Sequence, residues 1–541
     1  MTAVAPLTTS ARAGFGLKPA RPATLVLLLG VCLLGVLFSA ALALGLTALV
    51  PLMVLGGSIG LVVVIVLWQR PVRFVAVLLF AALVIEQYPI AGLNLITTQT
   101  HFFQSVSGAF HVPIPVQPAE ILLLLALAAV LFPALSNDPA APAFYRGALF
   151  RPVMLFLLAV LACLAYGVVS SRGGFSFNAA WAEARSFIYL TICYVLASNL
   201  INTRARLNTF VWIIIVALGL KGLQGIHSYM IEKQQGVHLD AITGHEDVVF
   251  FGTFFVLLSA FKIYGGPKRQ QLVMLAFLLP LLFTELETGR RIAFFVLGMA
   301  YVVFGASMLR IKRQTFYRVA PVAALLIGAY TAIFWNHPNG ALGQPMRAFK
   351  SQIGYADARD ESSDAWRVLE RENITRNIKS APITGLGFGH EYTFYVAEPS
   401  LTTTDPNDPS KVLGFVYWTY ITHCAIFWVW MKMGIFGYLA FWYLFGSGIV
   451  LGLITVRTVS DGYCRALAMT IVTLLIMQIM FSYGDLGLTY SRSMIYVGLM
   501  LGVLVRLPEL AVKPLPGGGS LRAAAPAVPA PLAVTPAPGG D

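Results

Sequence analysis

The chain has 541 residues, of which 58% are hydrophobic and only 11% are charged. Soluble domains carry about 25% charged residues, so a soluble fold of this composition would have too little polar surface. The net charge of +13 does not indicate nucleic-acid binding, because many basic residues sit in short loops between apolar runs, which is the pattern of the positive-inside rule. The five cysteines form no CxxC pair and indicate neither a disulfide framework nor a zinc site.

Apolar runs long enough to cross a bilayer recur along the chain, since a helix needs about 20 residues to span the hydrocarbon core. We count about 14 candidates, from 24–45 and 47–68 near the start to 489–507 near the end, and the run at 74–90 is short for a span. The expected fold class is therefore all-α: a polytopic transmembrane helical bundle of about 12–14 spans with a large, partly helical loop.

Basic residues set the expected orientation. Several pairs fall in loops that an inside N-terminus places in the cytoplasm: Arg70 with Arg73, Arg146 with Arg151, Arg204 with Arg206, and Arg310 with Arg313. The segment 91–117, which has no Lys or Arg, and the charged loop 337–417 then fall outside. Both termini are expected in the cytoplasm.

The chain divides on this basis into five segments. They are a cytoplasmic tail at 1–23, an N-terminal transmembrane bundle at 24–336, a large outer loop at 337–417, C-terminal transmembrane helices at 418–508, and a cytoplasmic tail at 509–541. The last segment is rich in Pro, Ala and Gly, so we expect it to be disordered and to carry no chemistry.

The outer loop contains one predicted helix, at 363–380. Ser362 or Ser363 can cap its N-terminus, and Pro382 follows its end. A rough apolar stripe along this helix predicts that it lies on the membrane surface over the bundle.

Four residues on the outer side attract attention because basic residues there run against the topological trend. Arg185, Arg290 and Arg291 stay charged and present a planar fork that suits phosphate oxygens. His423 lies near the point where the chain re-enters the membrane, and histidine is a residue type that can accept a proton at neutral pH.

Each of these residues also has a structural alternative. Arg290 and Arg291 follow Glu285 and Glu287, and such arginines can extend to the membrane surface and pair with those carboxylates. Arg185 can be an interface anchor, and His423 can be an interfacial histidine with a structural hydrogen bond.

Two further groups are weaker candidates. One group of metal-ligand residue types has a spacing that fits no standard site, so a solvated loop is expected: His238, Asp240, His245, Glu246 and Asp247. The glycine-rich segment 385–390 follows a helix rather than a strand, which predicts a tight turn and not a dinucleotide site. Few carboxylates lie deep in the apolar runs, whereas ion-coupled transporters need ionisable groups near mid-membrane.

The order of several segments resembles the bacterial O-antigen ligase and Wzy-type O-antigen polymerase superfamily. The matching pieces are Thr-Gly-Arg-Arg at 288–291, the Ser-Arg-containing helix start at 362–367, the Pro-x-x-Gly-x-Gly-x-Gly turn at 382–389, His423, and the glycine-rich span start at 433–438. Together they cover roughly residues 180–460.

This resemblance implies a membrane glycosyltransferase of the bacterial inner membrane with its active site facing the periplasm. Its donor is a glycan on undecaprenyl diphosphate. The acceptor is the hydroxyl of a lipid A core sugar, of a growing lipid-linked polysaccharide such as O-antigen or exopolysaccharide, or of a protein Ser or Thr. The reaction is inverting, with no metal and no cofactor, and the partners are the donor, the acceptor and membrane lipids.

The resemblance also assigns roles. Arg290, Arg291 and Arg185, with Arg367 from the loop, bind the diphosphate leaving group, and His423 takes the acceptor proton or orients the hydroxyl. Arg290, Arg291 and His423 are the expected catalytic residues. Two alternatives from other classes stay open: a lipid-linked glycan flippase or polysaccharide exporter, and a non-catalytic scaffold of an export complex.

Overall fold

The computed structural model describes residues 60–511 apart from short internal gaps, the longest at 106–114 and 136–142. The expected tails at 1–23 and 509–541 lie outside the described residues except for 509–511, and so does the first expected span at 24–45.

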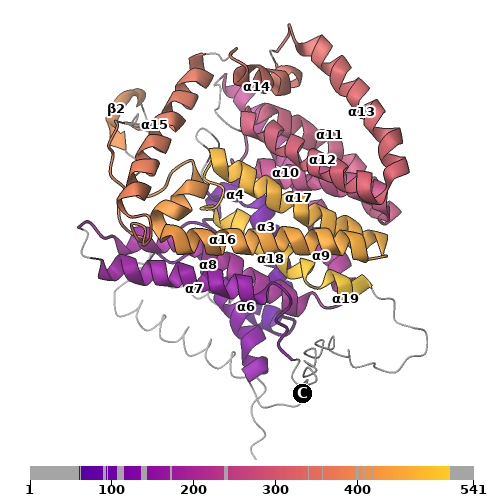
Figure 1. Cartoon of the computed structure of the whole chain (residues 1–541), viewed down its shortest axis with the longest axis horizontal. Helices are drawn as coiled ribbons and strands as arrows, with labels where there is room; N and C mark the ends of the chain where they lie inside the picture. Colours follow the sequence, from indigo (N-terminus) through magenta and orange to yellow (C-terminus); the bar gives the residue numbers. More distant parts are fainter. Residues whose placement is uncertain are drawn as a thin grey trace, which may run out of the picture.

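Helices make up nearly all of the described fold (Figure 1). In chain order they are α3 (Val72–Val84), α4 (Ile96–Gln99), α6 (Pro118–Leu135), α7 (Phe150–Val169), α8 (Phe177–Leu200), α9 (Arg204–Gln235), α10 (Asp247–Ala260), η1 (Phe261–Gly265), α11 (Lys268–Glu287) and α12 (Arg291–Ile311). They continue as α13 (Arg313–Phe334), η2 (Ala341–Gly343), α14 (Gln344–Gln352), α15 (Ala358–Ser380), α16 (Ala425–Thr458), α17 (Gly462–Gly484), α18 (Ser491–Leu504) and α19 (Leu507–Ala511).

Eight helices in the described part are long and apolar enough to cross a membrane, and a bent pair raises the number to nine. The expected all-α polytopic fold is confirmed. The run at 74–90 does not form a straight span, because α3 meets the preceding helix, Val62–Trp68, at an angle of 117°. Pro71 stands at this break, and a proline there ends one helix and can begin the next.

The centre of the bundle is built from tightly packed helices. α8 and α18 lie side by side, and every residue of α18 is buried. Small residues make this approach possible: a Cβ on Gly498 would lie 2.3 Å from the carbonyl oxygen of Leu190, and one on Gly502 would lie 2.6 Å from that of Tyr194. At the edge, α13 has no buried residue, and it stands away from the centre (Figure 1).

The loop helix α15 begins earlier than predicted. It starts at Ala358 instead of 363, so the predicted caps Ser362 and Ser363 lie inside it. Asp360 and Glu361 in its first turn favour a helix N-terminus at the observed position, because they complement the helix dipole. Its end at Ser380, before Pro382, agrees with the prediction.

The buried face of α15 is largely polar, which the predicted apolar stripe did not include. Asn373 accepts hydrogen bonds from the backbone N–H groups of Tyr395 and Val396, both at 2.8 Å. Asn377 accepts one from the N–H of Thr393 at 3.0 Å and donates to the carbonyl of the same residue at 2.7 Å. These two amides fasten the returning chain to α15. Beyond it, β1 (Leu401–Asp405) and β2 (Asp408–Val416) form a short antiparallel hairpin that the sequence did not predict.

The glycine-rich segment 385–390 forms turns, as predicted, and packs against a break in α16. The break is at Gly434, whose φ is 65°. The N–H groups of Leu386 and Gly387 donate to the carbonyls of Met431 and Lys432 at 2.8 and 3.0 Å, which satisfies backbone groups that the break releases. A Cβ on Gly434 would lie 2.0 Å from the carbonyl oxygen of Ile383, so only glycine fits here.

Candidate active site

The candidate site lies at the end of the bundle that carries α15, which we call the α15 end. Figure 1 shows α15 at this end of the bundle. α15 contacts the first residue of α12 through Asp364 and contacts His423, two residues before α16, through Glu370. It also touches the C-terminus of α17, where the Nε of Arg367 donates to the carbonyl of Gly484 at 3.3 Å. α15 therefore connects segments that lie far apart in the sequence.

Arg291, the first residue of α12, is bound to two carboxylates of α15. Its Nη1 and Nη2 donate to the two oxygens of Asp364 at 2.9 and 2.7 Å, and its Nε lies 3.3 Å from Oδ1 of Asp360. This fork-to-carboxylate geometry is the strong form of an ion pair. Its charge is therefore largely balanced, and the pair holds α15 on α12.

Arg290 has a different environment. Its Nη2 contacts Nε2 of His245, and its buried Nε has no hydrogen-bond partner among the described residues. Burial lowers the pKa of Arg290, and the neighbouring Asp485 opposes this shift, but an arginine keeps its charge in a protein. Glu285, the expected alternative partner, is buried with both carboxylate oxygens unpaired in the described part of the chain.

His245 is held by a buried carboxylate. Its Nδ1 lies 3.2 Å from Oδ2 of Asp485, whose Oδ1 accepts a hydrogen bond from the N–H of Leu486 at 2.7 Å. Burial raises the pKa of Asp485, but the hydrogen bond from His245 and the nearby charge of Arg290 hold it well below its usual range. The prediction of a solvated loop is wrong for Glu246 and Asp247, which are buried. His238 and Asp240, which belong to the same prediction, lie outside the described residues.

Arg367 has contacts near both arginines: it binds a residue next to Asp485, the partner of His245, and pairs with Asp364, a partner of Arg291. Besides its bond to Gly484, it donates from Nη1 to Ser363 Oγ at 2.6 Å and lies 3.6 Å from Asp364. Gly484 immediately precedes Asp485, and the charge of Arg367 contributes to the lowered pKa of Arg290. Arg290, Arg291 and Arg367 are thus brought together at the α15 end.

His423 is not part of α15 but contacts this helix at Glu370, closer to its C-terminus than the arginine contacts. Its Nδ1 is 3.2 Å from Oε1 of Glu370, and its backbone N–H donates to the same oxygen at 2.9 Å. Its ring meets Trp366 edge to face at 5.2 Å. We assign the proton to Nδ1 from this geometry, which makes Nε2 the basic nitrogen.

Glu370 is a site residue that sequence reasoning missed. It is buried, and it follows Arg367 by three residues on the same helix. Asp364, Arg367 and Glu370 therefore form one i, i+3 stripe, in which the ends lie about 9 Å apart along the axis. The arginine group and His423 face one continuous strip of α15.

Arg185 is placed elsewhere. It lies on α8 and pairs with Glu120 of α6 at 3.7 Å. Trp181 and Tyr189 donate hydrogen bonds to the same carboxylate oxygen at 2.9 Å. In the described residues Arg185 shares no hydrogen bond or ion pair with Arg290, Arg291 or Arg367.

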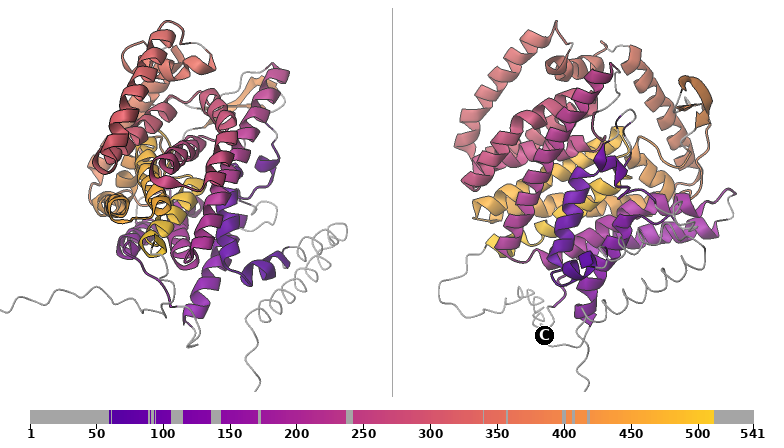
Figure 2. Two further views of the ribbon diagram at one scale, coloured as in Figure 1. Left: turned by 90° about the vertical axis from the view of Figure 1, so that its right-hand side faces the viewer. Right: turned by 180° about the vertical axis from the view of Figure 1, so that it is seen from behind.

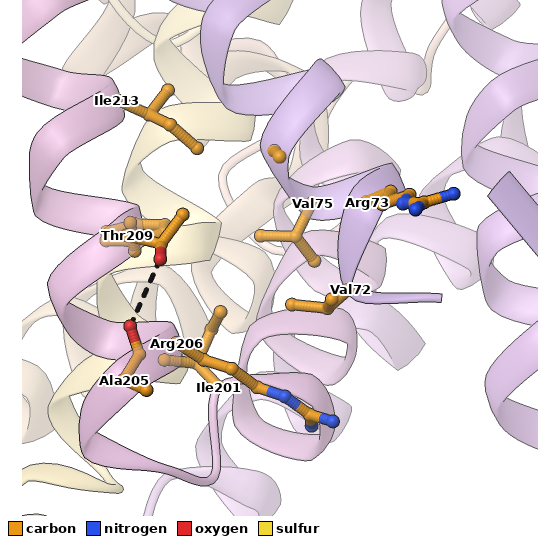
Figure 3. Close-up of a pocket in the computed structure, with 10 residues that line it drawn as sticks. Val72, Arg73, Val75, Ile201, Ala205, Arg206, Thr209 and Ile213 are labelled. Atoms are coloured by element: carbon orange, nitrogen blue, oxygen red, sulfur yellow. Dashed lines mark hydrogen bonds between the residues drawn. The ribbon is translucent and has the colours of Figure 1, made fainter. Parts of the chain in front are cut away.

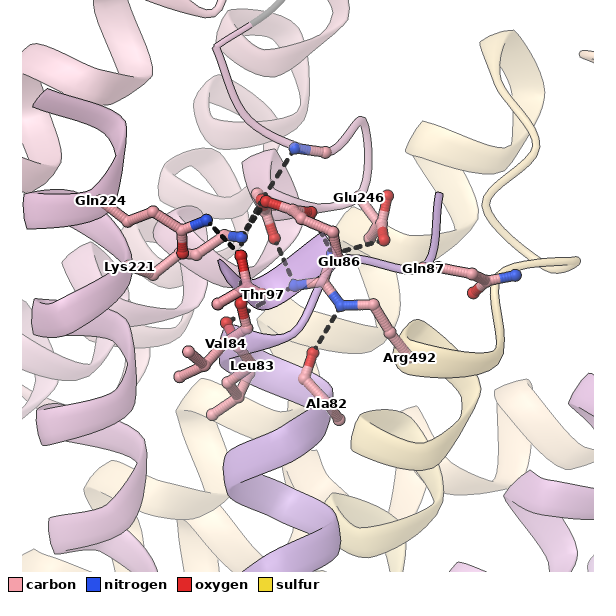
Figure 4. A network of polar contacts seen from close by, with 12 residues as sticks. Ala82, Leu83, Val84, Glu86, Gln87, Thr97, Lys221, Gln224, Glu246 and Arg492 are labelled. Carbon is pink, nitrogen blue, oxygen red and sulfur yellow. Dashed lines mark hydrogen bonds and ion pairs between the residues drawn. The ribbon is translucent and has the colours of Figure 1, made fainter. Parts of the chain in front are cut away.

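A buried network of five charges stands beside His245 (Figure 4). Arg492 lies 2.6 Å from Glu246, 2.8 Å from Asp247 and 3.2 Å from Glu86. Lys221 contacts Glu86 and lies 3.4 Å from Asp247. All five side chains are almost inaccessible to solvent. Sequence analysis missed Lys221 and Arg492, although a cation inside an apolar run is itself an indication of a buried partner.

These ionisable groups gather in one half of the bundle. Asp247 begins α10, Arg492 is the second residue of α18, and Glu86 follows the last residue of α3 by two. Lys221 lies about 26 Å along α9 from its first residue. A second buried pair, Lys432 with Glu183 at 2.7 Å, is close to the starts of α16 and α8.

The end of the bundle opposite α15 contains a mostly apolar cavity. α3 and α9 lie side by side (Figure 2), and near their N-termini they enclose a cavity of about 220 Å³. Mostly apolar side chains line it, with Arg73 and Arg206 beside them (Figure 3). None of the predicted site residues lines this cavity.

One comparison with known proteins matches the part of the chain that carries most of these residues. A search of curated proteins found no match. Residues 272–442 match the family model described as O-Antigen ligase. The matched segment contains Arg290, Arg291, Arg367 and His423, whereas Arg185 and His245 lie outside it. Over this segment, about a third of the chain, the protein is similar to the O-antigen ligase family.

Proposed function

We propose that this protein transfers a glycan from undecaprenyl diphosphate to an acceptor hydroxyl at the periplasmic face of the bacterial inner membrane. The family supports an enzyme of the O-antigen ligase or polymerase type. The observation that carries the finer proposal is one helix, α15, that contacts both an arginine group and a histidine–carboxylate pair.

The arginines serve the leaving group. As the bond between the sugar anomeric carbon and the phosphate oxygen breaks, its electron pair leaves with the diphosphate and negative charge grows there. Fixed guanidinium groups stabilise this charge most in the transition state. Arg290 is the main candidate because, among the described residues, it forms no direct ion pair with a carboxylate. Arg367 adds a second charge, and Arg291 positions α15 through Asp364.

His423 serves the acceptor. The acceptor oxygen attacks the anomeric carbon on the face opposite the diphosphate, and its proton passes to Nε2 of His423. Glu370 holds the ring and stabilises the imidazolium that forms. The displacement inverts the anomeric centre. A positioned general base contributes about 10²–10⁴-fold to such a step.

Arg185 receives a structural role in this proposal. Its ion pair with Glu120 joins α8 to α6, and in the described part of the chain it shares no hydrogen bond or ion pair with the arginine group.

A flippase or exporter would require a different distribution of polar groups. It needs polar groups that line a path through both halves of the membrane. In the described residues the buried charge network is confined to the α15 end, and at the opposite end Arg204 and Asp461 form a partly exposed pair at 2.7 Å. This distribution favours chemistry at one face over transport across the bilayer.

The decisive assay uses the purified full-length protein in lipid nanodiscs. It receives a glycan linked to undecaprenyl diphosphate, a chelator, and in separate reactions a lipid A core oligosaccharide, a second lipid-linked glycan, or an acceptor peptide. We expect one acceptor to be glycosylated with stoichiometric release of undecaprenyl diphosphate and an inverted anomeric linkage. Movement of the donor across a vesicle membrane without release would support the flippase instead.

A further inference from the structure

We infer that His245 and Asp485 are positioning residues that hold the Arg290 guanidinium toward the diphosphate. This inference rests on the proposed function. Asp485 orients His245 through Nδ1 at 3.2 Å, and the other ring nitrogen, Nε2, contacts Nη2 of Arg290. The three side chains form one relay from the C-terminal end of α17 to the N-cap of α12.

The direction of the hydrogen bonds follows from the chemistry of the groups. An ionised carboxylate only accepts and a guanidinium only donates. His245 must therefore carry its proton on Nδ1, donate it to Asp485, and accept from Arg290 at Nε2. A protonated imidazole has no lone pair for this contact and would repel the arginine.

A neutral imidazole restrains the guanidinium without neutralising it. Arg291, by contrast, faces the carboxylates of Asp360 and Asp364 directly. Arginine has five N–H donors, and the contact with His245 uses one of them. Arg290 as a residue is only partly buried, so its remaining N–H donors are available for oxygens of the ligand.

The segment that carries His245 is anchored by polar contacts of the neighbouring residues. Gly244 donates its N–H to Asp247 at 3.0 Å, and Arg492 binds both Glu246 and Asp247 (Figure 4). A Cβ on Gly244 would lie 2.9 Å from a carboxylate oxygen of Glu86, so the chain is closely packed here. The buried network thereby fixes the position from which His245 reaches Arg290.

The test is a double-mutant cycle on the affinity of the purified protein for undecaprenyl diphosphate. Arg290→Ala removes the proposed ligand, and His245→Ala removes its restraint. We expect His245→Ala to weaken binding about tenfold, which corresponds to the loss of one hydrogen bond to a charged group. In the Arg290→Ala background the same change should have almost no effect, because His245 acts through Arg290.

A conservative variant of His245 distinguishes a positioning role from a role in packing alone. In His245→Gln the side-chain carbonyl can accept from Arg290, so most of the affinity should return. Asp485→Asn keeps the shape but loses the charge that orients the ring, and we expect an intermediate affinity. His337→Ala, at an exposed histidine outside the site, is the matched control and should bind normally.

Two outcomes would overturn the inference: equal losses from His245→Ala in both backgrounds, or His245→Gln as weak as His245→Ala. Its failure is distinct from failure of the proposed function. If Arg290→Ala weakens binding but His245→Ala does not, only the positioning role is lost. If Arg290→Ala binds normally, the diphosphate site itself is misplaced.

Discussion

At the scale of single residues, the partners of each arginine decide what it can do. Arg291 is paired with two carboxylates, Arg185 with one, and Arg290 with a histidine nitrogen. A guanidinium whose charge is already balanced gains less from an incoming phosphate than one restrained by a neutral group. Arg290 is therefore the arginine best suited to bind a phosphate, a distinction between the arginines that the sequence alone does not show.

Glu370 is expected to act through His423. Glu370→Gln keeps the size of the side chain but removes the charge that stabilises the imidazolium, so kcat should fall roughly 10²-fold, the lower end of a general-base contribution. Steady-state release of undecaprenyl diphosphate measures this. Glu372→Gln, two residues along and exposed on the same helix, is the control and should keep full turnover. Equal activity of the two variants would exclude Glu370 from the site.

Arg492 is expected to matter for stability. Its removal leaves Glu86, Glu246 and Asp247 with Lys221 as the only cation of the network. Breaking a buried ion network in this way costs about 3–5 kcal/mol.

Thermal unfolding in detergent should therefore show a much lower midpoint for Arg492→Ala than for the wild type. Arg376→Ala, at an exposed pair with Glu372, should change the unfolding free energy by less than about 1 kcal/mol. Similar midpoints for both variants would show that the network does not stabilise the fold.

The sequence identified the arginines and His423 but not their carboxylate partners. Arg290 and Arg291 violate the topological trend, and His423 lies in a recognisable motif. Glu370 and Asp485 belong to no motif and break no topological trend. Their partners, His423 and His245, are 53 and 240 positions away in the sequence, so only the folded structure shows the pairs. Residue chemistry was predictable, but pairing depends on tertiary contacts.

At the scale of elements, α15 determines the geometry of the site. The position of its end was predictable because a proline follows it. Its start and its polar buried face were not, since the asparagines that fasten the returning chain look like solvent-exposed residues in a charged loop. The hairpin β1–β2 escaped prediction for a related reason: the loop contains no long alternating pattern of apolar residues.

The break in α16 gives a prediction for this element. Gly434→Ala places a Cβ against the carbonyl of Ile383 at a positive φ, so the glycine-rich turn must move away from α16. We expect a loss of at least about 2 kcal/mol in stability, together with lower activity.

Gly446→Ala is the matched control on the same helix, because nothing lies within 4 Å of its Cβ position. Alanine there should be neutral or stabilise by up to about 1 kcal/mol. Unfolding midpoints of the two variants check both expectations. If Gly434→Ala is as stable as Gly446→Ala, the turn does not depend on the break.

At the scale of the whole molecule, the buried charge network is concentrated at the α15 end, next to the proposed site. The all-α polytopic class followed from composition alone. The span count did not, because α3 is one arm of a broken helix pair, and the run at 24–45 lies outside the described residues. Hydropathy counts apolar runs but does not show whether a run is straight.

The proposed orientation predicts which surfaces a membrane-impermeant thiol reagent reaches. The four described cysteines are buried, so we would replace Cys32 by Ser and introduce single cysteines at exposed positions. Val368→Cys on α15 should be labelled in cells whose outer membrane alone is permeable. Gln314→Cys, at the start of α13, should be labelled only after the inner membrane is opened. The reverse pattern would place α15 in the cytoplasm.

The central claim is that Arg290 and His423 act together in glycan transfer. The most direct test measures undecaprenyl diphosphate release and acceptor glycosylation by Arg290→Ala, His423→Ala and Arg376→Ala, all folded by their unfolding midpoints. We predict loss of both products in the first two variants, by about 10²-fold or more for His423→Ala, and wild-type rates in the third, whose arginine lies on the exposed face of α15. Wild-type turnover in either of the first two variants would contradict the account.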